Sequence, residues 1–162
     1  MIKILDNDSI YDSIIMRVVL DTNVFISSLI RGDGVNRRVL EMAFEGQITP
    51  VMGDALYFEY ESVMMRDDLF ENSLLNATER SEFLDALCSV SEWVEVYYKW
   101  RPNLRDEADN HVLELALSGN APIIISSNLK DFRGGDLDMP DVRVINPVEF
   151  IRQQKGHSKW QH

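Results

Sequence analysis

Short apolar runs alternate with longer helical patterns along most of this chain, and this alternation limits its possible folds. The runs that we predict to be β-strands are rich in valine and isoleucine: Arg17–Leu20, Ile48–Met52, Val94–Tyr98, Pro122–Ser126 and Val142–Ile145. Because helical patterns separate them, we predict an α/β fold in which a parallel sheet carries helices on both faces. In such folds, ligands bind beyond the carboxyl ends of the strands.

The segments predicted to be helices carry apolar residues at helical spacing. They are Val35–Phe44, Asp54–Met65, 68–75, 78–90, Asp106–Leu117 and Pro147–Gln153. We expect Gly46 to end the first of these helices. We also expect Asp54 and Thr78 to cap the helices that begin at those positions.

Composition limits the classes of function. The formal net charge of −11 argues against general nucleic-acid binding through a basic surface, but not against a nuclease whose acids hold cations. The single cysteine, Cys88, cannot form an internal disulfide, and no apolar run is long enough to span a membrane. We therefore expect a cytoplasmic protein. The histidines His111, His157 and His162 are scattered in the sequence and do not indicate a zinc site.

Asp21 directly follows the strand predicted at Arg17–Leu20. Its carboxylate should therefore lie at the sheet edge where ligands bind. An aspartate at this point also commonly caps the following helix. Both interpretations remain open from position alone.

Glu59 is expected on the apolar face of its helix, because it lies three residues after Leu56 and four before Val63. Burying a lone carboxylate costs free energy unless it is paired or bound to a cation. Glu59 is therefore either part of a site or at the helix edge, with its carboxylate in water.

Two later segments of the chain carry further polar candidate residues. Asp106 is a natural N-cap, whereas Asp109 shares a stripe with Val112 and Leu113 and should face the sheet. The largely polar segment 126–132 follows the isoleucine run 123–125 and forms either an ordinary turn or part of a site.

These acids define a candidate metal site. Asp21, Glu59 and Asp109, with either Asn128 or Asp131, could converge on one cleft. Oxygen ligands of this kind suit hard divalent cations.

Five segments resemble the motifs of PIN domains in order and spacing. They are residues 18–27, 56–63, 105–110, 125–132 and 145–150, and the match covers roughly residues 16–151. The last segment resembles the VapC-like branch, which contains toxin components of toxin–antitoxin systems.

The resemblance implies a three-layer α/β/α sandwich around a parallel sheet of about five strands. It implies a PIN-like nuclease domain at residues 16–153, between an N-terminal extension at 1–15 and a polar tail at 154–162. The implied activity is hydrolysis of RNA phosphodiester bonds with Mg²⁺ or Mn²⁺. The implied partners are an antitoxin protein and further copies of the chain, in a homodimer or higher homo-oligomer.

The resemblance also assigns roles to individual residues. It places the catalytic acids on Asp21, Glu59 and Asp109, which would hold a metal, and adds Asp131 as a further ligand. Supporting roles fall on residues that orient carboxylates or water: Asn23, Asp106, Ser126 and Asn128. Many relatives carry aspartate where this chain has Asn128, which leaves the second metal site open.

Basic residues near these motifs are candidate phosphate contacts, although each is more often simply solvated. They are Arg31, Arg37, Arg38, Lys130 and Arg133. One alternative is a PIN fold without catalysis that acts as an interaction module. Another is a phosphoryl-transfer or receiver domain with an aspartate after its first strand, although Asn23 stands where one such class has a second acid.

Overall fold

The computed structural model describes residues 15–96, 110–132 and 141–158. Its five parallel strands lie in the order β3-β2-β1-β4-β5, so the first strand is at the centre of the sheet. The strands are β1 (Met16–Leu20), β2 (Ile48–Met52), β3 (Glu92–Trp93), β4 (Ile123–Ile125) and β5 (Arg143–Ile145). The predicted parallel sheet is confirmed.

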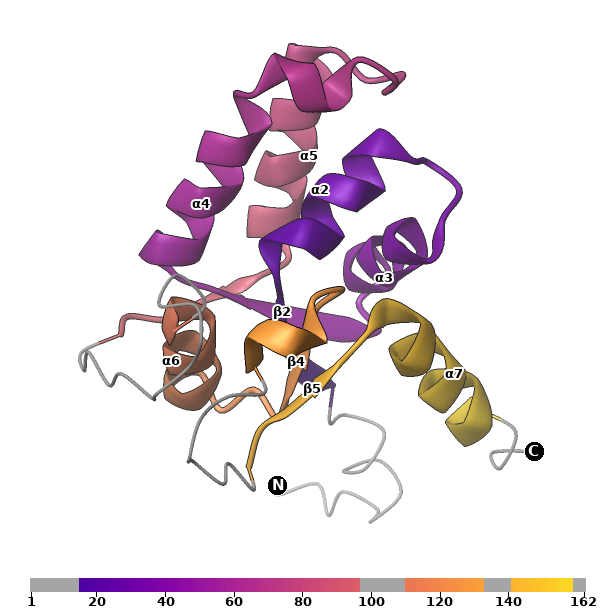
Figure 1. Ribbon diagram of the computed structural model, residues 1–162. Helices are drawn as coiled ribbons and strands as arrows, with labels where there is room; N and C mark the ends of the chain where they lie inside the picture. Colours follow the sequence, from indigo (N-terminus) through magenta and orange to yellow (C-terminus); the bar gives the residue numbers. More distant parts are fainter. Residues whose placement is uncertain (1–14, 97–109, 133–140, 159–162) are drawn as a thin grey trace, which may run out of the picture.

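Helices cover both faces of this sheet. The α-helices are α2 (Thr22–Ile30), α3 (Val35–Phe44), α4 (Asp54–Met64), α5 (Ala77–Ser89), α6 (Asn110–Ser118) and α7 (Pro147–Ser158). Two short 3₁₀ turns are η1 (Asp67–Phe70) and η3 (Leu129–Phe132). Figure 1 shows α2, α3, α4 and α5 above the sheet and α6 below it. This arrangement is the predicted three-layer α/β/α sandwich, and it follows from right-handed crossovers in both directions from β1.

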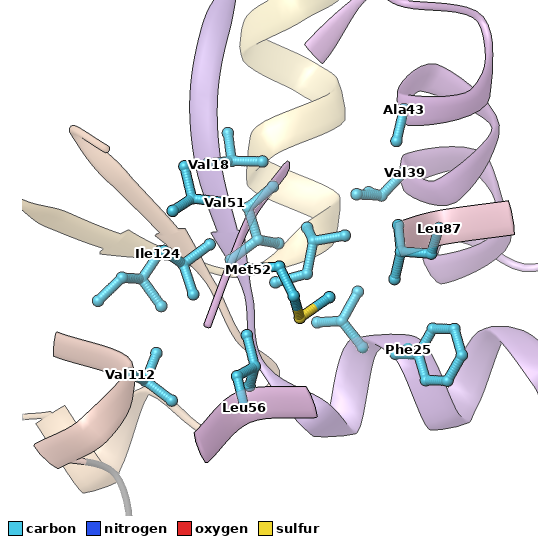
Figure 2. Close-up of a cluster of buried hydrophobic side chains, with 14 of the residues drawn as sticks. Val18, Phe25, Val39, Ala43, Val51, Met52, Leu56, Leu87, Val112 and Ile124 are labelled. Carbon is cyan, nitrogen blue, oxygen red and sulfur yellow. The ribbon is translucent and has the colours of Figure 1, made fainter. Parts of the chain in front are cut away.

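The hydrophobic core lies against both faces of the central strands. Val18, Val51 and Ile124 are fully buried strand residues, and Figure 2 shows them among side chains of the surrounding helices. Leu87 of α5 and Val112 of α6 pack from different layers of the sandwich. Strands buried on both faces explain why the sequence reads as continuous apolar runs at these positions.

Helix α3 occupies the predicted residues, because both its apolar pattern and its end are encoded locally. Gly46 follows it with φ of 77°, a left-handed conformation that glycine adopts at little cost. Its N–H donates to the Ala43 carbonyl, and the Gln47 N–H donates to the Met42 carbonyl. These bonds close the last turn of the helix.

Two predicted helix caps are wrong. Gly53 is the N-cap of α4, so Asp54 is its first helical residue and makes no side-chain cap bond. Asn76, rather than Thr78, caps α5 and forms a reciprocal capping box with Glu79. An asparagine with a glutamate three residues later satisfies two backbone N–H groups, which a cap at Thr78 would not.

Two predicted elements are shorter or shifted. The helix expected at 68–75 is the 3₁₀ turn η1 at Asp67–Phe70. The strand expected at Val94–Tyr98 is instead β3 at Glu92–Trp93, and residues 97–98 lie outside the described residues. Its partner β2 ends at Met52, whose carbonyl accepts from the Val94 N–H, so pairing cannot continue beyond that point.

The closing helix α7 continues to Ser158 instead of ending at Gln153, since polar residues on a solvent face do not by themselves end a helix. The predicted boundary at 154 therefore falls inside it. Residues 1–14 lie outside the described residues, and β1 begins at Met16. In the described parts of the chain, none of the helices has the combined length and apolar character that a membrane crossing requires.

Candidate active site

Asp21 is the first residue after β1, and it has both of the roles considered from sequence. Its backbone N–H donates to the Ile125 carbonyl of β4 at 2.9 Å, which fixes it at the carboxyl edge of the sheet. Its carboxylate Oδ1 accepts from the Thr22 N–H at 2.8 Å and so caps α2. The same residue therefore starts a helix and presents an acid at the predicted edge.

The other oxygen of Asp21 is held by the neighbouring strand exit. Ser126, directly after β4, donates its hydroxyl to Asp21 Oδ2 at 2.6 Å, and Asn23 Nδ2 donates to the same oxygen at 3.3 Å. Only 4% of Asp21 is exposed. This burial raises its pKa, the bonds from Ser126 and Thr22 oppose the rise, and the charge of Glu59 adds to it.

A network of polar groups joins the exits of β1 and β4. Asn23 Nδ2 donates to Ser126 Oγ at 3.3 Å, and Asn23 Oδ1 accepts from the Ser127 N–H at 3.1 Å. Ser126 Oγ also accepts from the Asn128 N–H at 3.0 Å. Asn23 and Ser126 thus restrain the loop and the Asp21 carboxylate together.

Glu59 of α4 reaches the same edge and is half-buried. Thr22 Oγ1 donates to Glu59 Oε1 at 2.6 Å, and His111 Nε2 of α6 bonds to Glu59 Oε2. Burial alone would raise the pKa of Glu59, but the bonds from His111 and Thr22 outweigh it and lower the pKa. Thr22 therefore links the two acids, because its N–H serves Asp21 and its hydroxyl serves Glu59.

Tyr60 sets the position of α4 relative to β1. It is fully buried, its ring stacks on Phe25 with centroids 4.7 Å apart, and its hydroxyl donates to the Leu20 carbonyl. Leu20 immediately precedes Asp21, and Tyr60 immediately follows Glu59. This contact therefore brings the two acids to the same part of the sheet edge.

The two acids line an open depression of about 300 Å³. Its lining residues are Asp21, Thr22, Asn23, Ile26, Glu59, Val63 and Asn128. Together with Ser126, this set contains five of the predicted site residues. A depression bordered by two carboxylates and side-chain amides offers oxygen donors to a ligand.

Three predicted site residues cannot be placed in the same way. Asp106 and Asp109 lie outside the described residues. The backbone of Asp131 lies in η3, but its side chain is not among those described. Their roles stay predictions from the sequence.

Sequence reasoning missed Thr22 and His111. Thr22 follows Asp21 directly, and a hydroxyl beside a candidate acid was the available signal. His111 was set aside because the histidines are scattered in sequence, but its place on α6 brings it against Glu59, which is 52 residues away.

Two of the candidate phosphate contacts have structural partners instead. Arg37 donates to the Ser28 carbonyl at 2.8 and 3.0 Å, and its guanidinium lies over the Phe83 ring. Arg38 pairs with acids on and just after its own helix. Arg31 and Lys130 are exposed, and Arg133 lies outside the described residues.

The donors at Asp21 and Glu59 fit a hard divalent cation as part of a larger ligand set. Within the described ranges, the partners of Asp21 are neutral side chains and a backbone N–H, and neither acid pairs with lysine or arginine. A buried carboxylate beside a second acid is stabilised by a nearby positive charge. The described residues alone do not bring three histidine, cysteine, aspartate or glutamate side chains together as a cation site.

Comparison with known proteins identifies the family. A family model described as the PIN domain matches residues 17–130. The chain belongs to the PIN domain family. An uncharacterised protein of Methanocaldococcus jannaschii is 31% identical over 152 residues, covering 88% of this chain and 94% of that protein.

A solved structure shares the fold of this PIN domain. It is the crystal structure of VapBC2 from Rickettsia felis bound to a DNA fragment from their promoter, with a TM-score of 0.56 and 17% identity. The match covers 81% of this chain and 98% of that chain. The PIN domain assignment removes the receiver and phosphoryl-transfer folds considered from sequence.

Proposed function

We propose that this PIN domain is an endoribonuclease that uses Mg²⁺ or Mn²⁺ to hydrolyse RNA phosphodiester bonds. The observation that carries the proposal is the meeting of Asp21 and Glu59 through Thr22 at the carboxyl edge of the sheet. Two ordered carboxylates at the mouth of an open depression are suited to holding a cation and a phosphate together.

In this proposal Asp21, Glu59 and Asp109 hold one cation, and Asp131 contributes to a second. Asp109 directly precedes Asn110, the first residue of α6, and the next residue, His111, contacts Glu59. This sequence relationship supports a third acid near the pair. When bound, the cation lowers the pKa of water and stabilises the negative charge that develops on the phosphate.

The remaining residues act on the carboxylates and the substrate. Asn23 and Ser126 hold the Asp21 carboxylate in one orientation through the bonds described above. Asn128, which lines the depression, and Asp106 would position water or a second cation. Orientation of this kind reduces the entropy lost when substrate and cation come together.

Single-stranded RNA is the substrate class that we infer. A flexible single strand can bend its backbone into an open depression, whereas a duplex cannot easily do so. The net charge of −11 excludes tight binding through a broad basic surface, so recognition has to be local. Arg31 and Lys130, whose side chains are exposed, are the remaining candidate phosphate contacts among the described residues.

We further propose that the protein is the toxin of a toxin–antitoxin pair in the cytoplasm. Residues 145–150 resemble the VapC-like branch, and the R. felis structure that shares the fold is that of VapBC2 with promoter DNA. The expected partners are an antitoxin and a second copy of this chain. Co-purification of the chain with the product of a neighbouring reading frame would test this part.

Asp21→Asn is the decisive variant for catalysis. Asparagine caps helices as well as aspartate does, so the fold should persist while one negative charge is lost. We expect no cleavage of single-stranded RNA in Mn²⁺ by this variant. The matched control is Asp85→Asn, an exposed acid on α5, which should cleave like the wild type. Undiminished metal-dependent cleavage by Asp21→Asn would falsify the proposal.

The alternative is a PIN fold that acts as an interaction module without catalysis. Asn128, where many relatives carry aspartate, is the observation in its favour. Calorimetric titration with Mn²⁺ separates the two functions. A nuclease should bind Mn²⁺ and lose that binding in Asp21→Asn, whereas a module should show no binding in either protein.

A further inference from the structure

His111 and Thr22 hold the Glu59 carboxylate from opposite layers of the sandwich. Thr22, at the start of α2, donates to one oxygen, and His111, in the first turn of α6, bonds to the other. Both partners of this second bond are largely shielded, since the His111 side chain is 21% exposed and that of Glu59 is 31% exposed.

The direction of the His111 bond follows from the chemistry of its partner. An ionised carboxylate only accepts hydrogen bonds, so Nε2 of His111 has to carry the proton. A protonated ring nitrogen has no lone pair to offer to a cation. In this geometry His111 cannot be a metal ligand through Nε2, and the bond that it makes to a candidate acid is the one to Glu59.

The surroundings of His111 agree with this indirect role. Asp21 and Glu59 line the depression of about 300 Å³, but His111 lines a second depression of about 420 Å³ together with Asp54 and Glu114. Helices α4 and α6 pack together at this edge (Figure 1). Glu59 therefore lines the first depression and its bonded partner His111 lines the second.

We propose that His111 is a positioning residue that orders Glu59 for cation binding, an inference that rests on the proposed function. A free glutamate side chain has several rotamers, and ordering it costs conformational entropy. With Thr22 on one oxygen and His111 on the other, this cost is met during folding. The cation then meets a carboxylate that is already in place.

The test compares His111→Leu, which fills similar space without a donor, with His111→Gln, whose amide nitrogen can reach Glu59 in place of Nε2. We expect His111→Leu to weaken Mn²⁺ binding by about 10-fold or more in calorimetry, as loss of groups that orient ligands does elsewhere. His111→Gln should restore most of the affinity. The control, Glu114→Gln, changes a residue one turn further along α6 and should bind Mn²⁺ like the wild type.

A cation-free crystal structure of His111→Leu gives a second readout that does not depend on catalysis. We expect Glu59 to leave its wild-type rotamer or to lose the bond to Thr22. Unchanged Mn²⁺ affinity, tighter binding, or an unmoved Glu59 in this variant would each overturn the positioning role. If His111→Leu does not fold in a thermal melt, His111→Ala is measured in its place.

The two proposals fail in different ways. If the wild type binds no Mn²⁺, the metal-dependent function is wrong, and the His111→Leu structure still decides whether His111 orders Glu59. If the wild type binds Mn²⁺ and Asp21→Asn does not, but His111→Leu binds normally, then the function stands and the positioning role is wrong.

Discussion

The Tyr60 hydroxyl donates a hydrogen bond to the backbone carbonyl of Leu20. Tyr60 directly follows the candidate acid Glu59, and Leu20 directly precedes the candidate acid Asp21. Tyr60 is fully buried and its pKa is raised well above the usual tyrosine value by that burial, so the hydroxyl stays a donor at any physiological pH. The placement of Glu59 beside Asp21 therefore depends on a bond that neither acid makes.

Tyr60→Phe should destabilise the protein and impair the site together. The change leaves a buried carbonyl without this donor, which costs about 1–3 kcal/mol in free energy of unfolding. Denaturation in urea measures this loss, and RNA cleavage should fall with it. The control is Tyr57→Phe, because the Tyr57 hydroxyl bonds at the surface to Glu61 at 3.1 Å. If both variants were equally stable, the Leu20 contact would have no special role.

Asp21→Asn and Glu59→Gln should change the pH dependence of stability in opposite directions. Folding raises the pKa of Asp21 above 3.8, so ionised Asp21 costs stability as pH rises through that raised value. Folding lowers the pKa of Glu59 below 4.5, so ionised Glu59 adds stability that is lost as pH falls through the lowered value.

We therefore expect the free energy of unfolding of the two variants to change in opposite directions, relative to wild type, as pH rises. Relative to wild type, Asp21→Asn should gain stability between acidic and neutral pH, whereas Glu59→Gln should lose it over that interval. Urea denaturation at a series of pH values, without divalent cations, measures both. A parallel pH dependence in the two variants would contradict the opposite pKa directions.

Ser126→Ala should raise the pKa of Asp21 further. The substitution removes the 2.6 Å hydroxyl bond that favours the ionised carboxylate, and it also removes an acceptor for the Asn128 N–H. Carboxyl carbon NMR titration reads the pKa of Asp21 directly, and cleavage should fall by about 10-fold if this bond orients a metal ligand. Ser127→Ala is the matched control, since Ser127 bonds to Asn23 through its backbone N–H. If the pKa of Asp21 were unchanged in Ser126→Ala, the Ser126 hydroxyl would not be the main group that opposes the rise in pKa caused by burial.

Asn76→Ala should destabilise α5, whereas Thr78→Ala should not. Asn76 accepts from the Glu79 N–H at 2.8 Å, and loss of such a cap typically costs about 1 kcal/mol. Thermal unfolding of the two variants measures the difference. Equal melting temperatures would show that the reciprocal bonds with Glu79 contribute nothing.

Much of the fold and part of the site could be predicted because they depend on local patterns. Valine and isoleucine runs located four of the five strands, and the parallel arrangement placed Asp21 and Ser126 at one edge. Helical spacing put Glu59 on the apolar face of its helix but did not decide between a site and the helix edge. To predict these features, it is enough to know which residues share a face of one helix or strand and which strand ends lie at the same sheet edge.

The missed features depend on competition or on long-range contact. Thr78 and Asn76 are both acceptable caps locally, and the choice between them depends on Glu79. The position at which β3 ends depends on where its partner β2 ends. The apolar residues around β3 do not encode that position. His111 belongs to the site only because α6 packs against α4, and no spacing rule connects it to Glu59.

The bonds around the two acids join parts of the chain that are synthesised at very different times. Asp21 accepts a hydrogen bond from Ser126, which lies 105 residues later, and Glu59 bonds to His111, which lies 52 residues later. A nascent chain that has not yet emerged as far as β4 cannot complete this arrangement. A chain truncated before β4 therefore lacks the bond that orients Asp21, and one truncated before α6 also lacks the bond from His111 to Glu59.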